Sequence, residues 1–156
     1  AAGAEELHDR DRQALLEGLA DGTIEVLATD HAPHYEAELQ VELDAVPFGI
    51  IGLETAVSLV LDRLVGGGVL TLPEAISKLT AGPAKVLNLP HGTLAEGAAG
   101  DVTLLDLGRE VTVDPDTFES RGRNTPFAGW TLKGCAVAAI VAGESRMNRI
   151  AGEVPA

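Results

Sequence analysis

The sequence predicts an α/β fold that ends in a β-rich tail, and three patterns in its 156 residues indicate this. One short β-branched segment, residues 24–29, lies between two segments with helical periodicity. Further helical segments continue to about residue 92, and short apolar runs separated by turn residues follow. A single buried strand cannot form a parallel sheet by itself, so the chain is not a complete doubly wound domain.

The N-terminal segments predict a helix, a strand and a loop, in that order. Residues 7–20 are rich in helix formers and end at an Asp-Gly turn signal. Residues 24–29, IEVLAT, are typical of a buried parallel strand. Residues 30–47 show no period and contain two prolines and five acids, so we expect a long loop.

Three helices are predicted in the middle of the chain. Apolar residues at helical spacing predict the first over residues 53–65, and three consecutive glycines end it. Thr71 and Glu74 have the spacing of a capping box, which starts the second helix. A Gly-Pro pair breaks that helix, and residues 84–89 form the third.

The tail predicts strands joined by turns. Its apolar, β-branched runs are the strand candidates, namely residues 102–107, 111–113, 130–132 and 135–141. The Asp-Pro-Asp sequence at 114–116 predicts a turn, and Gly143 closes the last strand.

Charge is distributed unevenly along the chain. Of the net charge of −13, residues 1–62 contribute −12, because 14 acidic residues face only Arg10 and Arg12. A nucleic-acid surface needs clustered cations, so we expect no nucleic-acid partner and interpret the acidic half as a solvated surface. The longest apolar run, residues 135–142, has the length of a strand, so we expect no membrane span. A single cysteine, Cys135, excludes an internal disulfide and fits a reducing, cytoplasmic location.

The heptapeptide ATDHAPH, at residues 28–34, carries the candidate chemistry. Asp30 follows the predicted strand directly, at the strand end where α/β and barrel folds place catalytic groups. Its carboxylate can ligate a metal ion and accept a proton from metal-bound water. His34 can face the same cavity and donate to an anionic substrate. The alternative interpretation makes Asp30 a cap or turn residue and His31 an exposed loop residue.

Other catalytic patterns are absent from the sequence. It contains no Gly-x-Ser-x-Gly elbow, no phosphate-binding glycine loop and no dinucleotide fingerprint. Cys135 lies in an apolar run, so we interpret it as a small core residue. Asn124 is no glycosylation site, because Pro126 stands where Ser or Thr is required.

With ATDHAPH at its centre, the sequence resembles the C-terminal portion of dihydroorotases, the zinc amidohydrolases of pyrimidine biosynthesis. Further segments match that family in the same order. They are PFGI at 47–50, GLETA at 52–56, PAK at 83–85, residues 97–105, NTPF at 124–127 and LKG at 132–134. Several separate motifs in one order make this resemblance specific.

The resemblance implies a role for each residue of the candidate site. Asp30 would end the eighth strand of a barrel, ligate one zinc of a two-zinc centre and act as the general base. His34 would bind the carboxylate of dihydroorotate. Phe48 and Gly49 would contact the substrate ring through their backbone, and the loop over residues 35–47 would border the site.

The resemblance also implies the organisation of the chain. Residues 1–92 would form the C-terminal end of a (β/α)₈ barrel with its extra helices, and residues 93–156 part of the flanking β-sandwich. The family's His-x-His pair, its other metal ligands and its substrate-binding Arg have no counterpart here. We therefore expect the C-terminal portion of a metal-dependent hydrolase, inactive alone. It would need the N-terminal barrel portion, with a second copy or aspartate transcarbamoylase as a protein partner.

Two alternatives stay open. The first is a non-catalytic, dihydroorotase-like structural partner of aspartate transcarbamoylase. Residues 3–7 favour it, because they differ from the family's Asn-Pro-Pro-Leu-Arg segment, whereas Asp30 and His34 favour an enzyme. The second is a sister hydantoinase or allantoinase, against which ATDHAPH and the Pro-Phe-Gly at 47–49 both count.

Overall fold

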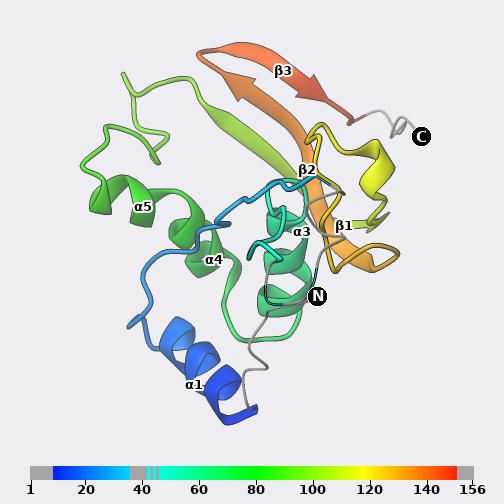
Figure 1. The fold of residues 1–156 in the computed structure, drawn as a ribbon. Helices are drawn as coiled ribbons and strands as arrows, with labels where there is room; N and C mark the ends of the chain where they lie inside the picture. Colours follow the sequence, from blue (N-terminus) through cyan, green and yellow to red (C-terminus); the bar gives the residue numbers. More distant parts are fainter. Residues whose placement is uncertain (1–8, 36–41, 43, 45, 151–156) are drawn as a thin grey trace.

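The fold is described by a computed structural model that defines residues 9–35, 42, 44 and 46–150. Its helices are α1 (Asp9–Ala20), α3 (Ala56–Leu59), the π-helical turn η1 (Val60–Val65), α4 (Leu72–Leu79), α5 (Ala81–Val86) and the 3₁₀ turn η2 (Pro115–Thr117). Its strands are β1 (Val102–Thr112), β2 (Thr131–Val141) and β3 (Glu144–Asn148). Figure 1 shows α3 and η1 in the middle, with the sheet on one side and α4 and α1 on the other.

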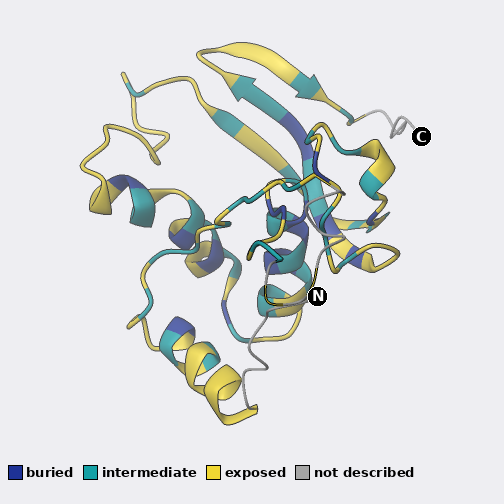
Figure 2. Ribbon diagram, in the orientation of Figure 1, coloured by how far each residue is buried: buried dark blue, intermediate teal, exposed yellow. Residues whose placement is uncertain are grey.

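The helix predicted over residues 7–20 is confirmed where the structure describes it, as α1. Residues 7 and 8 lie outside the described part of the chain. Leu19 is the buried residue of this helix and packs with Val60, Leu70 and Ala75 in a small apolar cluster. Most of α1 is exposed in Figure 2, so one turn of the helix provides its contact with the body.

The helix predicted over residues 53–65 forms, but it starts later and changes its winding. Residues 53–55 are a turn, α3 follows, and η1 continues with i to i+5 bonds such as Gly66 N to Leu61 O at 2.8 Å. The glycines end it as expected, and Gly68 takes a positive φ of 73°.

The capping box at Thr71 and Glu74 is confirmed. The Thr71 backbone donates to the Glu74 carboxylate at 2.7 Å, and Glu74 N donates back to Thr71 Oγ1. The next helix, predicted over residues 84–89, is α5 and starts earlier, at Ala81. A proline fits the first turn of a helix because the first backbone N–H groups have no partner within the helix.

The strand predicted over residues 24–29 is wrong for the part of the chain that the structure describes, because no ladder forms there. Its backbone instead bonds to α4: Leu27 N donates to Lys78 O at 3.0 Å, and Lys78 Nζ donates to Ile24 O. A buried parallel strand needs a neighbouring strand on each side, and the described residues provide none. The buried ammonium of Lys78 takes up one of the unpaired carbonyls.

The tail forms a three-stranded antiparallel sheet in the order β1-β2-β3. The four predicted strand candidates merge into two long strands, whose pairing continues across two register shifts, at Leu104/Leu105 and at Asp106/Glu110. Gly134 (φ 96°) of β2 lies at the second shift. The third strand, β3, was not predicted. Ala142 and Gly143, both at positive φ, turn the chain back as a tight hairpin, and polar residues of ESRMN form its edge.

The sheet packs against the central helix through β2, and buried apolar residues lie at this contact. Leu132 of β2 and Ile51, just before α3, are fully buried. A Cβ on Gly134 would stand 2.8 Å from Leu61, so only glycine lets strand and helix approach this closely. An apolar cleft of about 860 Å³ remains between the α4–α5 side and the β1–β2 side.

The predicted division at residue 92 falls in a segment without helix or strand, between α5 and β1. The three strands of the sheet all follow it, within residues 93–156. The described helices include none with the length and apolar composition that a bilayer crossing requires.

Candidate active site

Asp30 begins the candidate site in an unusual backbone conformation. Its φ is 43°, in the left-handed region that Asp tolerates better than most residues. Its side chain is exposed and forms no hydrogen bond to any residue that the structure describes. Backbone conformations of this kind cost free energy and concentrate at functional sites. The carboxylate is thus available for a ligand.

His31 is half-buried and fixed by both ring nitrogens, so its interpretation as an exposed loop residue is wrong. Its Nδ1 accepts from Gly52 N at 3.1 Å, and its Nε2 lies 3.3 Å from Ser120 Oγ. Because Nδ1 accepts, the neutral ring carries its proton on Nε2 and donates to Ser120. His31 therefore ties the segment beside Asp30 to the turn that precedes α3.

The structure brings His34, Phe48 and Gly49 together. His34 Nε2 donates to Phe48 O at 3.0 Å, and Ala32 N donates to Ile50 O at 3.0 Å. The two segments, residues 30–34 and 48–50, therefore run against each other as a pair. The ring of Phe48 is 77% exposed, so it faces outward from this pair.

Gly49 is required by the geometry of this pair. Its φ is 123°, and a Cβ at this position would lie 2.5 Å from Ala32 Cβ. Any larger residue would push the two segments apart. The loop predicted over residues 35–47 lies largely outside the described residues, so its position over the site stays a prediction.

Asn124 links the two segments from a distant part of the chain. Its Oδ1 accepts from His34 N at 3.2 Å, and its Nδ2 donates to Ala32 O at 2.8 Å and to Gly49 O at 3.2 Å. The sequence contained one signal for it, the NTPF match at 124–127, which carried no role. Of the two residues that complete the surroundings of His31, Glu54 lies in the GLETA match at 52–56, which also carried no role, and Ser120 carried no signal.

Glu54 supports the same region with a perturbed carboxylate. Ser120 N donates to Glu54 Oε1 at 2.9 Å, while Oε2 is buried and has no hydrogen-bond partner among the described residues. Burial by itself raises the pKa of Glu54, but the Ser120 hydrogen bonds and the nearby His31 outweigh it, so the net pKa is lowered. Glu54 is therefore held as the carboxylate.

Among the described residues, side chains that can ligate a metal ion do not form a cluster around one position. No three His, Cys, Asp or Glu side chains in this part of the chain lie close enough to hold one ion. The exposed carboxylate of Asp30 has the chemistry of one zinc ligand, whereas zinc sites use three or four protein ligands. The described residues can thus contribute one ligand to a zinc centre, but they do not form such a centre alone.

The chain belongs to the amidohydrolase family, whose sequence profile matches residues 2–146. The proteins that it resembles are of two kinds, dihydroorotases in sequence and hydantoinases in structure. In sequence it is 54% identical to the dihydroorotase of Geobacillus sp. (strain WCH70), over 86% of this chain and 31% of the relative. The chain therefore spans about a third of the length of the curated relatives it matches.

The solved structures that resemble it confirm the fold. The L-hydantoinase (dihydropyrimidinase) from Arthrobacter aurescens superposes with a TM-score of 0.85 and 29% identity, over 95% of this chain and 34% of that one. The inactive dihydroorotase-like domain of the Chaetomium thermophilum CAD-like multifunctional protein gives 0.67 and 26%, over 94% and 39%. The α/β fold of a partial amidohydrolase barrel is thus confirmed.

Proposed function

We propose that this chain is the C-terminal third of a dihydroorotase. The enzyme would add water across the cyclic amide of dihydroorotate, reversibly, and form N-carbamoyl-L-aspartate in the cytoplasm. The observation that carries the proposal is the pairing of residues 30–34 with residues 48–50, the two segments expected to touch substrate. The 54% identity to a dihydroorotase selects this reaction among those of the amidohydrolases.

Asp30 is the proposed proton-transfer group and metal ligand. Two zinc ions, when bound, supply Lewis acidity that polarises the ring carbonyl and activates water near neutral pH. The water oxygen bonds to the carbonyl carbon and the ring C–N bond breaks. Asp30 accepts a proton from the attacking water and delivers it to the departing ring nitrogen. Its carboxylate, exposed and without a hydrogen bond to any described residue, supports this role.

His34, Phe48 and Gly49 form the proposed substrate contacts. His34 would donate to the substrate carboxylate, a charge-assisted bond that fixes the orientation of the ring. Backbone groups of Phe48 and Gly49 would contact the ring itself. Their mutual contacts support this assignment, since a common ligand needs all three at one place.

The proposal includes an architecture and partners. Residues 1–92 would complete a barrel with an N-terminal portion that carries the other metal ligands, and residues 93–156 would belong to the flanking β-sandwich. The substrate is a small molecule. A second copy or aspartate transcarbamoylase would be the protein partner.

One alternative has a specific observation in its favour. An inactive dihydroorotase-like domain superposes on 94% of the chain, which supports a non-catalytic structural partner of aspartate transcarbamoylase. Against it, Asp30 and His34 are both present, and the segments around them are fixed by hydrogen bonds. The hydantoinase or allantoinase alternative rests on a structural likeness with 29% identity, well below the identity to dihydroorotase.

The test uses a completed enzyme, made by joining this chain to the N-terminal part of the Geobacillus relative that precedes the matched region. The complete relative is the positive control, and hydantoin and allantoin are the competing substrates. Turnover of dihydroorotate, with little of either competitor, is the expected result. A folded, zinc-loaded protein that turns over none of the three would favour the structural partner.

A further inference from the structure

A single side chain from the β-rich tail holds the two segments expected to touch substrate. Asn124 bonds to His34 and Ala32 on one segment and to Gly49 on the other, at distances between 2.8 and 3.2 Å. It lies 90 residues after His34 in the chain.

The chemistry of these contacts requires an amide. Both protons of Asn124 Nδ2 go to backbone carbonyls, and Oδ1 accepts a backbone N–H. A carboxylate would retain the accepted bond but would place a second anionic oxygen against the carbonyls of Ala32 and Gly49. The site therefore distinguishes Asn from the nearly isosteric Asp.

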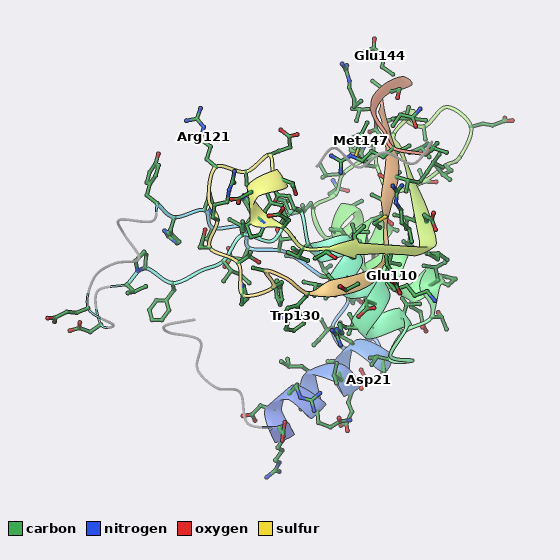
Figure 3. All side chains as sticks on the ribbon, turned by 90° about the vertical axis from the view of Figure 1, so that its right-hand side faces the viewer. Asp21, Glu110, Arg121, Trp130, Glu144 and Met147 are labelled. Carbon is green, nitrogen blue, oxygen red and sulfur yellow. The ribbon has the colours of Figure 1, made fainter. Side chains whose placement is uncertain are left out.

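The backbone at Asn124 and the loop that follows it are held by further contacts. Its carbonyl accepts from Ile51 N at 3.2 Å, and Ile51 is fully buried. Three residues on, the ring of Phe127 meets the edge of Trp130 at 5.3 Å between centroids, and the Arg63 guanidinium covers Trp130 at 5.1 Å. Figure 3 shows Trp130 at the inner end of this loop, where β2 begins, and Arg121 pointing away from the body.

Ser120, in the same loop as Asn124, makes further hydrogen bonds to the candidate site. Ser120 N bonds to Glu54, and Ser120 Oγ meets His31 Nε2. Residues 118–127, here termed the bridging loop, thus touch the candidate site at two points. A loop that only connected η2 to β2 would need neither contact.

We propose that Asn124 is a positioning residue that sets the spacing between His34 and the Phe48–Gly49 backbone, and hence the affinity for substrate. The inference deepens the proposed function and rests on it. Asn124 does not contact the reacting atoms in this proposal. Because Asp30 transfers the proton, loss of Asn124 weakens substrate binding and leaves the chemical step largely intact.

The test compares Asn124→Asp with a matched substitution, Asn148→Asp, in the completed enzyme. Asn148 is exposed at the end of β3, and its Oδ1 accepts from Ile150 N, a bond that Asp also makes. For Asn124→Asp we expect KM for dihydroorotate to rise roughly tenfold or more, with kcat within about threefold, since two hydrogen bonds are lost. For Asn148→Asp we expect both constants to stay unchanged.

A purely structural role gives a different pattern. If Asn124 only helped folding, fewer active molecules would lower kcat while KM stayed the same, and the proposal would be overturned. Unchanged KM and kcat would also overturn it. Wild type and Asn148→Asp serve as the reference for the reaction itself: if both lack activity, the proposed function fails and not the positioning role.

Hydrogen exchange followed by mass spectrometry tests the same idea without turnover. Peptides covering residues 30–35 and 48–52 should exchange faster in Asn124→Asp, and the β3 peptide should not. Unchanged exchange in both site peptides would refute the proposal even if no activity were measured.

Gly122→Ala provides a second variant if Asn124→Asp folds poorly. A Cβ there would lie 2.9 Å from both Asn124 Oδ1 and Pro33 Cβ, so it would displace the amide without removing it. A rise in KM smaller than that of Asn124→Asp is expected. A fall in kcat alone, or no change in either constant, would count against the role of Asn124.

Discussion

The sheet and the candidate site are held together in opposite ways. The strands β1 and β2, each eleven residues long, pair at eight positions, so the sheet is stabilised by many similar backbone hydrogen bonds. The paired segments at residues 30–34 and 48–50 have no regular structure and depend on a few specific bonds, several made by Asn124. Redundant bonding makes the sheet a stable support, whereas the site can be altered by a single side chain.

The largest effect is expected at the site, from Asp30→Asn in the completed enzyme. Turnover of dihydroorotate should be abolished, because the amide cannot accept the proton, while most of the zinc stays bound. Activity assays and metal analysis of the purified protein measure the two quantities. Turnover like that of wild type would remove Asp30 from its proposed role.

His34→Ala should mainly weaken substrate binding. A charge-assisted hydrogen bond contributes about 1.5–3 kcal/mol, so KM should rise roughly tenfold or more while the melting temperature changes little. Steady-state kinetics and thermal denaturation of the same preparation separate the two effects. An unchanged KM would count against contact with the substrate carboxylate.

In the sheet, Gly134→Ala should reduce stability and leave KM for dihydroorotate unchanged. The added Cβ meets Leu61 at 2.8 Å, and the φ of 96° disfavours any side chain, so we expect a loss of about 1–3 kcal/mol. Gly143→Ala is the matched control, because its φ is 80° but its surroundings are open. Equal losses of unfolding free energy in both variants would show that packing against Leu61 contributes nothing.

Thr71→Ala tests a local feature away from both regions. Loss of the cap at the start of α4 should cost about 1 kcal/mol, without effect on substrate affinity. Denaturant unfolding gives the change in free energy. No measurable change would mean that α4 is held by its buried face and not by its cap.

The smallest effect is expected from the titration of Glu54. Its pKa in the folded protein lies below the ordinary value of 4.5, so it stabilises the fold above that pH, and this contribution is lost as the pH falls through the folded pKa. The stability difference between wild type and Glu54→Gln should therefore shrink below about pH 4.5. Melting curves over a pH series check this, and a constant difference would contradict it.

The sequence predicted the elements whose cause is local. The Thr71–Glu74 box forms as expected, because its donors and acceptors lie three residues apart. The strand over residues 24–29 does not, because the described residues contain no neighbouring strand to pair with it. The strand β3 was missed since ESRMN is a polar edge strand whose position is set by the Ala142-Gly143 turn.

The candidate site shows the same division. Asp30, His34, Phe48 and Gly49 were predicted from short motifs, and the structure brings the last three together. The contacts of His31 were misjudged, because a lone histidine in a loop gives no sign of partners at Gly52 and Ser120.

By itself, the sequence determined the net charge, the helix boundaries set by caps and glycines, and the residues able to do acid–base chemistry. These follow from side-chain chemistry and from interactions over a few residues. Only the tertiary structure decided that residues near position 124 hold residues near positions 32 and 49 in place. A hydrogen bond depends on distance in space, and residues 90 positions apart acquire that proximity only when the whole chain has folded.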